Sequence, residues 1–415
     1  IFRGPDQERV DLVSLADRLA GVDREKALDA YAALLEVPLY RQLAVSRIDD
    51  YYMRFGDHAG LAAQWESIAA RDTLDALPWS RLGQACYRMG DLAKADNAFS
   101  LGVGKEDINQ ECRTGLMVVR FEQGRIGDGA ALAEAAVAAC PGLAPRVAGL
   151  CAAAGRARFA AGDALNAEVA LQAAVRFAPG GIDSRLLLGR LISGRGDTEQ
   201  GMALFDACAA ERPDLGGLVA ETCASAAQVC LGAGNAPGAV ALLRRCTALL
   251  PGDSRHRVKL AEALASAGDD GGAMTEGLKA FGETPEAADA AALVDSLLDK
   301  RGDQNARLDF WRRFTDAHPE AAVPRVYLGM ALAATGDGSG AEVACRAALQ
   351  RDPRNAAAKL RLGGLLAARG ELGEGLAQIA GAAAVRPELS GPAAEACAAA
   401  ANACMAAGHN DDAVA

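Results

Sequence analysis

Apolar and small side chains recur along the chain in segments of helical length, and short turns of glycine plus a polar residue separate these segments. Trp79, Leu82 and Gly83 show the spacing of one helix face. Runs of β-branched residues bounded by turn residues, which predict strands, are scarce. Alanine and glycine dominate, and aromatic residues make up only 5%. The pattern predicts an all-α protein whose helices approach closely, with small side chains between them.

The turn glycines reveal an internal repeat. The intervals between successive members are 34 residues, except for three intervals of 38. Glycine ends the first helix of a pair in a left-handed cap, and the polar residue after it begins the second. These glycines are Gly56, Gly90, Gly124, Gly162, Gly196, Gly234, Gly268, Gly302, Gly336, Gly370 and Gly408.

A proline stands seventeen residues after most of these glycines, where it stops the second helix. The prolines are Pro141, Pro179, Pro213, Pro251, Pro285, Pro319, Pro353 and Pro387. Each longer interval has its four extra residues just after a proline, so we expect the next helix to begin about one turn early. Gly21 and Pro38 show the same relation. This predicts a divergent repeat over residues 1–41 and a continuous array over 42–415, with the last repeat truncated.

With the turn glycine counted as position 15, the chain resembles the tetratricopeptide repeat family. One repeat carries the likeness in Trp79, Leu82, Gly83, Gly90, Ala95 and Phe99, and another in Leu188, Gly189, Gly196, Gly201, Phe205 and Pro213. The likeness covers the whole chain. It implies a right-handed α-solenoid, a superhelix of about eleven helix–turn–helix repeats.

The resemblance also implies that positions 2, 5, 9, 12 and 13 of each first helix face a concave groove. In the N-terminal half these positions hold Met53, Arg54, Tyr87, Arg88, Phe121, Arg156, Phe159 and Arg190. In the C-terminal half they include Val326, Met330 and Leu360. We expect a ladder of large side chains beside arginines, partly offset by Asp50, Glu111, Glu122 and Asp183. An extended peptide with apolar side chains and carboxylates would suit the first half, and an amphipathic helix the second. The alternative is that curvature buries these residues against neighbouring helices.

The other chemistry-bearing residues predict no catalytic, cofactor or metal site. The eleven cysteines contain no CxxC pair and fall mostly on packing positions, so we expect reduced, buried thiols. Cys151, Cys223 and Cys397 share position 4 of the three longer repeats, and a shared role for them is the alternative. Trp65 and Trp311 stand at position 24 and are expected in the core. The four histidines show no ligand spacing.

Net charge and hydropathy restrict the kinds of molecule that the chain is expected to bind. The net charge is −11, which argues against nucleic acid. No charge-free stretch of eighteen apolar residues occurs, so we expect no membrane span. The leading hypothesis is therefore a non-enzymatic scaffold that binds a protein or peptide. The alternative is the substrate-recognition arm of a larger enzyme, glycosyltransferase- or sulfotransferase-like, or of a membrane-anchored protein of envelope polysaccharide assembly.

The ends of the chain add three expectations. It begins at Ile1 and stops inside a helical pattern at Ala415, which predicts a piece of a longer polypeptide. The incomplete last repeat predicts end-to-end self-association through its apolar face. The composition is typical of a bacterial protein from a GC-rich genome. We expect a cytoplasmic location, with a periplasmic or membrane-attached one as the alternative.

Overall fold

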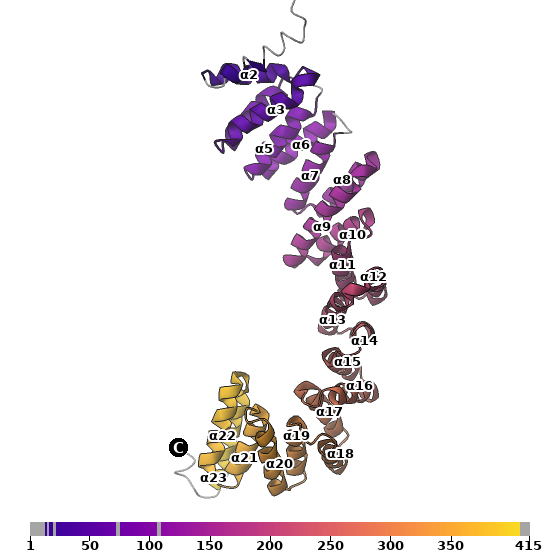
Figure 1. Cartoon of the computed structure of the whole chain (residues 1–415), viewed down its shortest axis with the longest axis vertical. Coiled ribbons are helices and arrows are strands. Elements are labelled where there is room, and N and C mark those ends of the chain that lie inside the picture. Colours follow the sequence, from indigo (N-terminus) through magenta and orange to yellow (C-terminus); the bar gives the residue numbers. More distant parts are fainter. Residues whose placement is uncertain (1–12, 15, 20–21, 72–74, 106–108, 407–415) are drawn as a thin grey trace, which may run out of the picture. The chain divides into compact units, whose positions relative to one another are not determined.

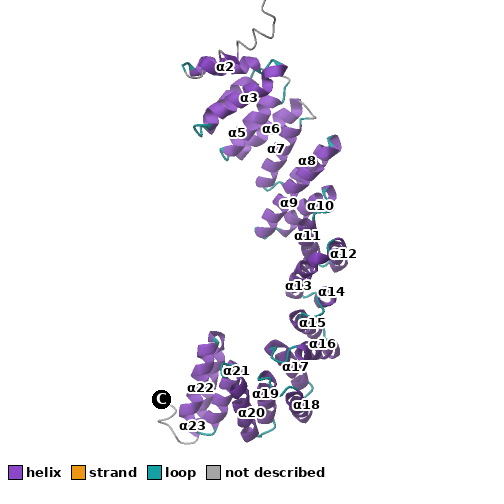
Figure 2. Ribbon diagram, in the orientation of Figure 1, coloured by secondary structure: helices purple, strands orange, loops and turns teal. Residues whose placement is uncertain are grey.

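The structure is a computed structural model that describes residues 13–14, 16–19, 22–71, 75–105 and 109–406. Within these ranges every regular element is a helix and none is a strand (Figure 2). The chain forms two compact units, residues 1–191 and 192–415, and the boundary falls inside α11 (Ile182–Arg195). The prediction of an all-α repeat protein is confirmed.

The N-terminal unit is a stack of helix pairs, in which α5, α7 and α9 line up on one side and α6, α8 and α10 on the other (Figure 1). Its described helices are α2 (Arg24–Leu34), α3 (Pro38–Met53), α4 (His58–Ala69), α5 (Leu77–Arg88), α6 (Leu92–Lys105), α7 (Gln110–Glu122), α8 (Ile126–Ala139), α9 (Ala144–Ala160) and α10 (Ala164–Phe177). Because α3 begins at Pro38, the expected boundary after residue 41 lies inside this helix.

The C-terminal unit repeats the same arrangement. Its described helices after α11 are α12 (Thr198–Glu211), α13 (Gly216–Gly232), α14 (Ala236–Leu249), α15 (Ser254–Ser266), α16 (Asp270–Glu283), α17 (Ala288–Lys300), α18 (Gln304–Ala317), α19 (Val323–Ala334), α20 (Gly338–Arg351), α21 (Ala356–Ala368), α22 (Leu372–Val385) and α23 (Ser390–Ala406). Each helix packs mainly on its neighbours in sequence, so each unit has the nearest-neighbour architecture of a solenoid.

The turn between the two helices of a repeat has a fixed geometry. Ten of the eleven predicted turn glycines have positive φ, between 66° and 116°, and Gly408 lies outside the described residues. The following residue caps the second helix. For example, the amide of Gly60 donates to the Asp57 carboxylate at 2.8 Å. Arg125 and Glu371 occupy the same cap position, but their side chains accept no such bond. The periodic turn chemistry therefore sets the repeat.

The three longer repeats lengthen the helix after the proline, as predicted. A 3₁₀ turn covers Pro141–Leu143, Pro213–Leu215 or Pro387–Leu389 (η1, η2 and η3) and runs directly into a helix of 17 residues. Among the other first helices, α5, α7, α11, α15, α17, α19 and α21 have 12–14 residues, and α3, which begins at Pro38, has 16. Thus α9, α13 and α23 each carry an extra turn at their N-terminus.

Large rings at position 24 pack on a small or specialised residue at position 8 of the same repeat. A Cβ added at Gly83 would come within 2.7 Å of the Phe99 ring. Trp65 and Trp311 are fully buried, which confirms their prediction as core residues. Each indole N–H donates to an aspartate at position 8: Trp65 to Asp49 at 2.9 Å and Trp311 to Asp295 at 2.8 Å. The core pairing is therefore set within single repeats.

The cysteines are free thiols in the packed interior, as expected. Eight of the ten described cysteines are buried, and Cys140 and Cys397 are half-buried. Burial raises the pKa of Cys151 to about 12 and that of Cys345 to about 11. The reactive thiolate is therefore disfavoured at these sites. Cys404 lies outside the residues whose side chains the structure describes.

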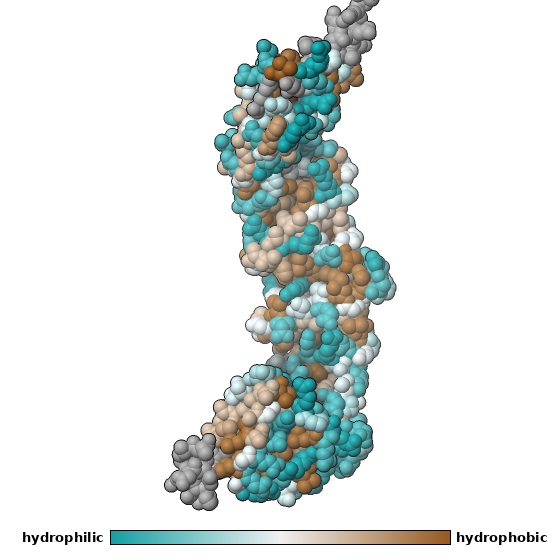
Figure 3. Space-filling view, turned by 60° about the vertical axis from the view of Figure 1, so that its left-hand side comes forward, coloured by the Kyte–Doolittle hydropathy of each residue, from teal (hydrophilic) through white to brown (hydrophobic). Residues whose placement is uncertain are grey.

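The exposed apolar residues are scattered. After Val22, the most exposed large apolar side chains of the described residues are Leu165, Leu39 and Phe55. In Figure 3, hydrophobic patches are separated by hydrophilic side chains over the face shown. One segment, Pro213–Gly232, is long enough to cross a membrane and has a mean hydropathy of 1.2. By length and composition it passes the test for a membrane span, contrary to the expectation of none. This segment contains α13, whose buried Val219, Cys223 and Cys230 belong to the helix stack, so its apolar composition serves repeat packing.

Candidate functional site

The first helices of three successive repeats enclose a pocket in the N-terminal unit. The pocket measures about 350 Å³, and its walls come from α5, α7 and α9, with Phe99 added from α6. The residues that line it are Gln84, Tyr87, Arg88, Phe99, Glu111, Thr114, Gly115, Val118, Arg146 and Leu150. Six of them stand at positions 2, 5, 9, 12 or 13 of their repeats. The structure therefore places a pocket on the face that the repeat register predicts.

Two of the predicted site residues, Tyr87 and Arg88, lie in this pocket. The Tyr87 hydroxyl donates a hydrogen bond to Glu122 of the next repeat, and this bond raises the pKa of Tyr87 to about 12. Arg88 Nη1 lies 3.1 Å from the Met53 sulfur of the preceding repeat. Met53 and Arg54 are exposed at the end of α3. Side chains at positions 12 and 13 therefore form a continuous strip across α3, α5 and α7.

Phe121 differs from the prediction, because it does not extend this strip to the surface. Its side chain is only 5% exposed. The ring lies over Gly129, the residue at position 20, where a Cβ would clash with it. Position 20 is alanine in the repeats of Tyr87 and Phe159, whereas the missing methyl group at Gly129 leaves room for the ring to turn inward. The prediction that Phe121 lines a groove is wrong for this reason.

Phe159, Arg156 and Arg190 extend the strip further. Phe159 is half-buried, and the Arg190 guanidinium lies over its ring at 5.0 Å from the centroid. This geometry is a cation–π contact between α9 and α11. Arg156 is exposed one turn earlier on α9. The structure thus brings the Phe159 ring and Arg190 together here, but outside the pocket between α5, α7 and α9.

Of the three groove residues predicted in the C-terminal half, two line a pocket and one is buried between helices. Met330 and Leu360 are half-buried and line a pocket of about 530 Å³ between α19, α21 and α23. Arg361 and Glu395 add charge to its wall. Val326 is 2% exposed and packs with the alanines Ala348 and Ala358, so its prediction as a groove residue is wrong. Its small neighbours let the helices close over the Val326 side chain.

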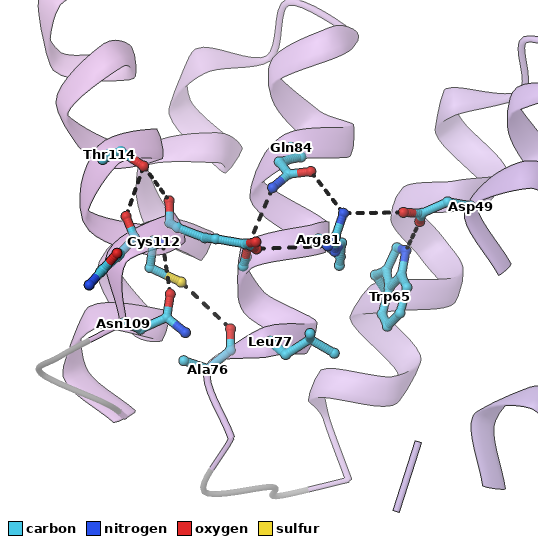
Figure 4. A network of polar contacts seen from close by, with 12 residues as sticks. Asp49, Trp65, Ala76, Leu77, Arg81, Gln84, Asn109, Cys112 and Thr114 are labelled. Carbon is cyan, nitrogen blue, oxygen red and sulfur yellow. Dashed lines mark hydrogen bonds and ion pairs between the residues drawn. The ribbon is translucent and has the colours of Figure 1, made fainter. Parts of the chain in front are cut away.

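A polar network joins α3, α5 and α7 and includes Glu111 of the pocket lining (Figure 4). Asp49 of α3 accepts the Trp65 indole and lies 3.4 Å from Arg81 of α5. Ser80 donates to Glu111 of α7 at 2.9 Å, and Arg81 lies 3.8 Å from the same carboxylate. Burial raises the pKa of Asp49 above its usual range, partly offset by these donors. The network ties three repeats together and fixes the position of α5 against its neighbours.

The charges along the pocket are unbalanced. Glu111 and Glu122 already accept hydrogen bonds from Ser80 and Tyr87. By contrast, none of the described carboxylates forms an ion pair with the arginines along this face, which are Arg88, Arg146 and Arg156. The pocket and its edge therefore present partnered carboxylates and cations that lack an ionic partner. Such an arrangement favours a ligand that carries carboxylates.

Sequence reasoning missed five lining residues that matter for this site. Gln84 and Val118 stand at position 9, and Thr114 at position 5, so the register alone would have found them. Leu150 and Arg146 could not be found in this way. Arg146 lies in the extra turn of α9, which a register of 34 residues does not contain. The longer repeat thus adds a cation to the wall of the pocket.

Comparison with known proteins finds a distant likeness to solved helical-repeat structures. No family model matches the chain, and no curated relative matches it by sequence. The crystal structure of yeast Tom70 is 14% identical with a TM-score of 0.38, covering 97% of this chain and 96% of that chain. TTC0263, a thermophilic TPR protein of Thermus thermophilus, is 20% identical with a TM-score of 0.32, over 43% of this chain and 98% of its own. YrrB, described as a TPR protein with an unusual peptide-binding site, is 18% identical with a TM-score of 0.28, over 46% of this chain and 96% of its own.

The class of the protein follows from its own geometry. Helix pairs recur at 34 or 38 residues, each pair turns at a glycine with positive φ, and most second helices end two residues before a proline. These features define a tetratricopeptide-type α-solenoid.

Proposed function

We propose that the N-terminal unit is a scaffold that binds an extended protein segment carrying carboxylates and at least one apolar side chain. The observation that carries this proposal is the pocket between α5, α7 and α9, with Arg88 and Arg146 on its wall. An extended segment could lie across the three first helices and place a carboxylate between these arginines. Its apolar side chain would contact Val118 and Leu150.

The charge of the pocket and its preorganisation both support this proposal. The polar network of Asp49, Arg81 and Glu111 holds α3, α5 and α7 in place before a ligand arrives. A rigid receptor loses little conformational freedom on binding. Arginine is suited to carboxylates because its planar fork can donate two parallel hydrogen bonds. Tyr87, fixed by Glu122, adds an amphipathic ring of the kind that anchors interfaces.

The proposal is tested with a random peptide library displayed on phage and selected on the immobilised full chain. We expect enriched sequences to combine Asp or Glu with large apolar residues. A fluorescent peptide of the enriched type should bind the double variant Arg88→Ala/Arg146→Ala about tenfold more weakly or worse, because interfacial arginines are frequent hot spots. The measurement is fluorescence anisotropy.

The matched control is Arg125→Ala/Arg176→Ala, which removes the same charge from the second-helix side of the same unit. These arginines pair with Asp128 and Glu134 and do not line the pocket. We expect the control to retain binding. Equal binding by the groove variant and the control would refute the groove as the site, and a library without acidic enrichment would refute the ligand chemistry.

A further inference from the structure

Three potential metal ligands converge between α13 and α15 in the C-terminal unit. A carboxylate oxygen of Glu221, a carboxylate oxygen of Asp253 and a ring nitrogen of His256 all lie within 4.8 Å of one another. Glu221 comes from one repeat, and the other two residues come from the start of the next. The cluster borders a pocket of about 370 Å³ on the first-helix face. It is separate from the pocket of the N-terminal unit.

His256 gives the cluster an unusual feature. Its side chain is only 1% exposed, and neither ring nitrogen has a hydrogen-bond partner within the described chain. Burying a polar group without such a partner destabilises the folded state, so the arrangement calls for an explanation. Nδ1 points toward the cluster and lies 3.4 Å from Asp253 Oδ2. In the neutral tautomer that carries its proton on Nε2, the ring would offer the Nδ1 lone pair to this site.

The distance between these two atoms fits a shared cation. Zinc binds histidine nitrogen and carboxylate oxygen at about 2.0–2.2 Å in tetrahedral geometry, which puts neighbouring ligand atoms about 3.3–3.5 Å apart. The 3.4 Å between His256 Nδ1 and Asp253 Oδ2 lies in this range. Glu221, whose side chain is 53% exposed, is free to move the remaining distance.

We propose that Glu221, Asp253 and His256 form a binding site for a divalent transition metal of the zinc type. One imidazole and two carboxylates are ligands that Zn²⁺ accepts, whereas Mg²⁺ and Ca²⁺ prefer oxygen ligands throughout. Three protein ligands leave one tetrahedral position open. Two of the ligands, Glu221 and His256, also line the pocket to which Lys259 and Glu262 contribute. The metal would link α13 to α15 across the junction of two repeats.

The positively charged guanidinium of Arg255 lies between the carboxylates of Asp253 and Glu221, where the metal would bind. Its Nη2 lies 2.7 Å from Asp253 and 3.5 Å from Glu221. The guanidinium therefore bridges the two carboxylates that a metal would bridge. Its side chain is 74% exposed, so it can swing into solvent with little loss of packing.

The test is titration of the full, metal-free chain with Zn²⁺ by calorimetry, followed by Co²⁺ as a spectroscopic probe. We expect one tight Zn²⁺ and a Co²⁺ spectrum without thiolate charge-transfer bands. Glu221→Gln should weaken binding at least about tenfold, since even second-sphere changes reach this size. Arg255→Ala should tighten binding, because it removes the competing cation. Mg²⁺ should not compete.

The matched control is Glu262→Gln, which removes one negative charge from the same pocket outside the cluster. We expect it to bind Zn²⁺ as the parent does. His256→Gln should abolish binding, with circular dichroism as a check on its fold. The exposed Glu221 variant decides the question if the buried histidine variant misfolds. Equal affinity in the Glu221→Gln and Glu262→Gln proteins, thiolate bands with Co²⁺ or no Zn²⁺ uptake would each overturn the proposal.

Discussion

At the scale of single residues, the repeat is held by complementary sizes at positions 8 and 24. Glycine at position 8 accepts a phenylalanine ring, as Gly83 does for Phe99. Where position 24 is tryptophan, position 8 becomes aspartate and accepts the indole N–H, as in Asp49–Trp65 and Asp295–Trp311. Each aspartate also pairs with an arginine, Arg81 or Arg307. Aspartate in place of glycine at position 8 therefore accepts a hydrogen bond from the buried indole N–H and pairs with the arginine.

The first prediction concerns Gly83. Replacement by alanine should destabilise the N-terminal unit by about 1–3 kcal/mol, because the new methyl group overlaps the buried Phe99 ring. Gly149→Ala is the matched control. Gly149 is exposed in the middle of α9 with nothing within 4 Å of an added Cβ, so alanine there should stabilise the helix by about 0.5–1 kcal/mol. Thermal and urea unfolding of both variants distinguish the two signs.

The second prediction concerns acid stability. Hydrogen bonding to Arg255 lowers the pKa of Asp253 to about 2 from an ordinary value of 3.8. The folded state therefore binds this proton less readily than the unfolded state. The resulting stabilisation is present above about pH 4 and is lost as the pH falls toward 2, amounting to at most about 2 kcal/mol.

Asp253→Asn tests this sign, since asparagine keeps the N-cap acceptor and removes the charge. The variant should be less stable at neutral pH, and its free energy of unfolding should change less between pH 4 and pH 2. Urea titrations across this range measure both quantities. A variant whose acid sensitivity equals that of the parent would show that Asp253 is not responsible.

At the scale of elements, the helix caps explain why the repeat tolerates variation at its turn. Eight of the described turns place Asp or Asn directly after the glycine, and each side chain accepts a backbone amide three residues later. Glu371 has nearly the same backbone angles but makes no such bond. Its side chain is one methylene longer and pairs with Arg369 instead.

The third prediction is a reciprocal exchange at two successive turns. Glu371→Asp should stabilise α22 by about 0.5–1 kcal/mol, because the shorter carboxylate can reach the first-turn amide at an unchanged charge. Asp337→Glu should lose a similar amount, since Asp337 caps α20 through the amide of Gly340 at 2.8 Å. Denaturant unfolding of the single and double variants measures both. Changes of the same sign would contradict the cap argument.

Elements also show what the sequence could and could not predict. The turns follow from glycine periodicity because positive φ is rare for other residues, and the helix ends follow from proline. Exposure at position 12 could not be predicted from that position alone. Tyr87 and Phe159 stay half-exposed above alanines, whereas Phe121 turns inward over Gly129. Glu221 and His256 stand at positions 2 and 3 of successive first helices, so the repeat register brings them together, whereas a search for histidine pairs at ligand spacing does not.

At the scale of the whole molecule, stability should be local because each helix packs mainly on its sequence neighbours. The fourth prediction uses Arg307→Ala. This change leaves the Asp295 carboxylate, which is only 5% exposed, without the guanidinium that donates to it at 2.7 Å. Loss of one partner of a buried ion pair costs about 3–5 kcal/mol.

Hydrogen exchange read by mass spectrometry should therefore rise in α17, α18 and α19, while α5, α7 and α9 keep the protection of the parent. Arg312→Ala on the same helix is the control, since its side chain is 53% exposed and should leave exchange unchanged. Equal loss of protection in both units would show that the molecule unfolds as one cooperative body, against the nearest-neighbour architecture.

The extra turn of α9 has a consequence for how any bound segment is positioned. A groove made of identical 34-residue intervals has translational symmetry, so a repetitive ligand could shift by one repeat at no change in free energy. Within the N-terminal unit, the additional turn of α9 breaks that symmetry and puts Arg146 there. It therefore makes one binding position along the groove different from all positions shifted by a repeat. The alignment of the segment is then dictated by the receptor and does not depend on the segment being irregular itself.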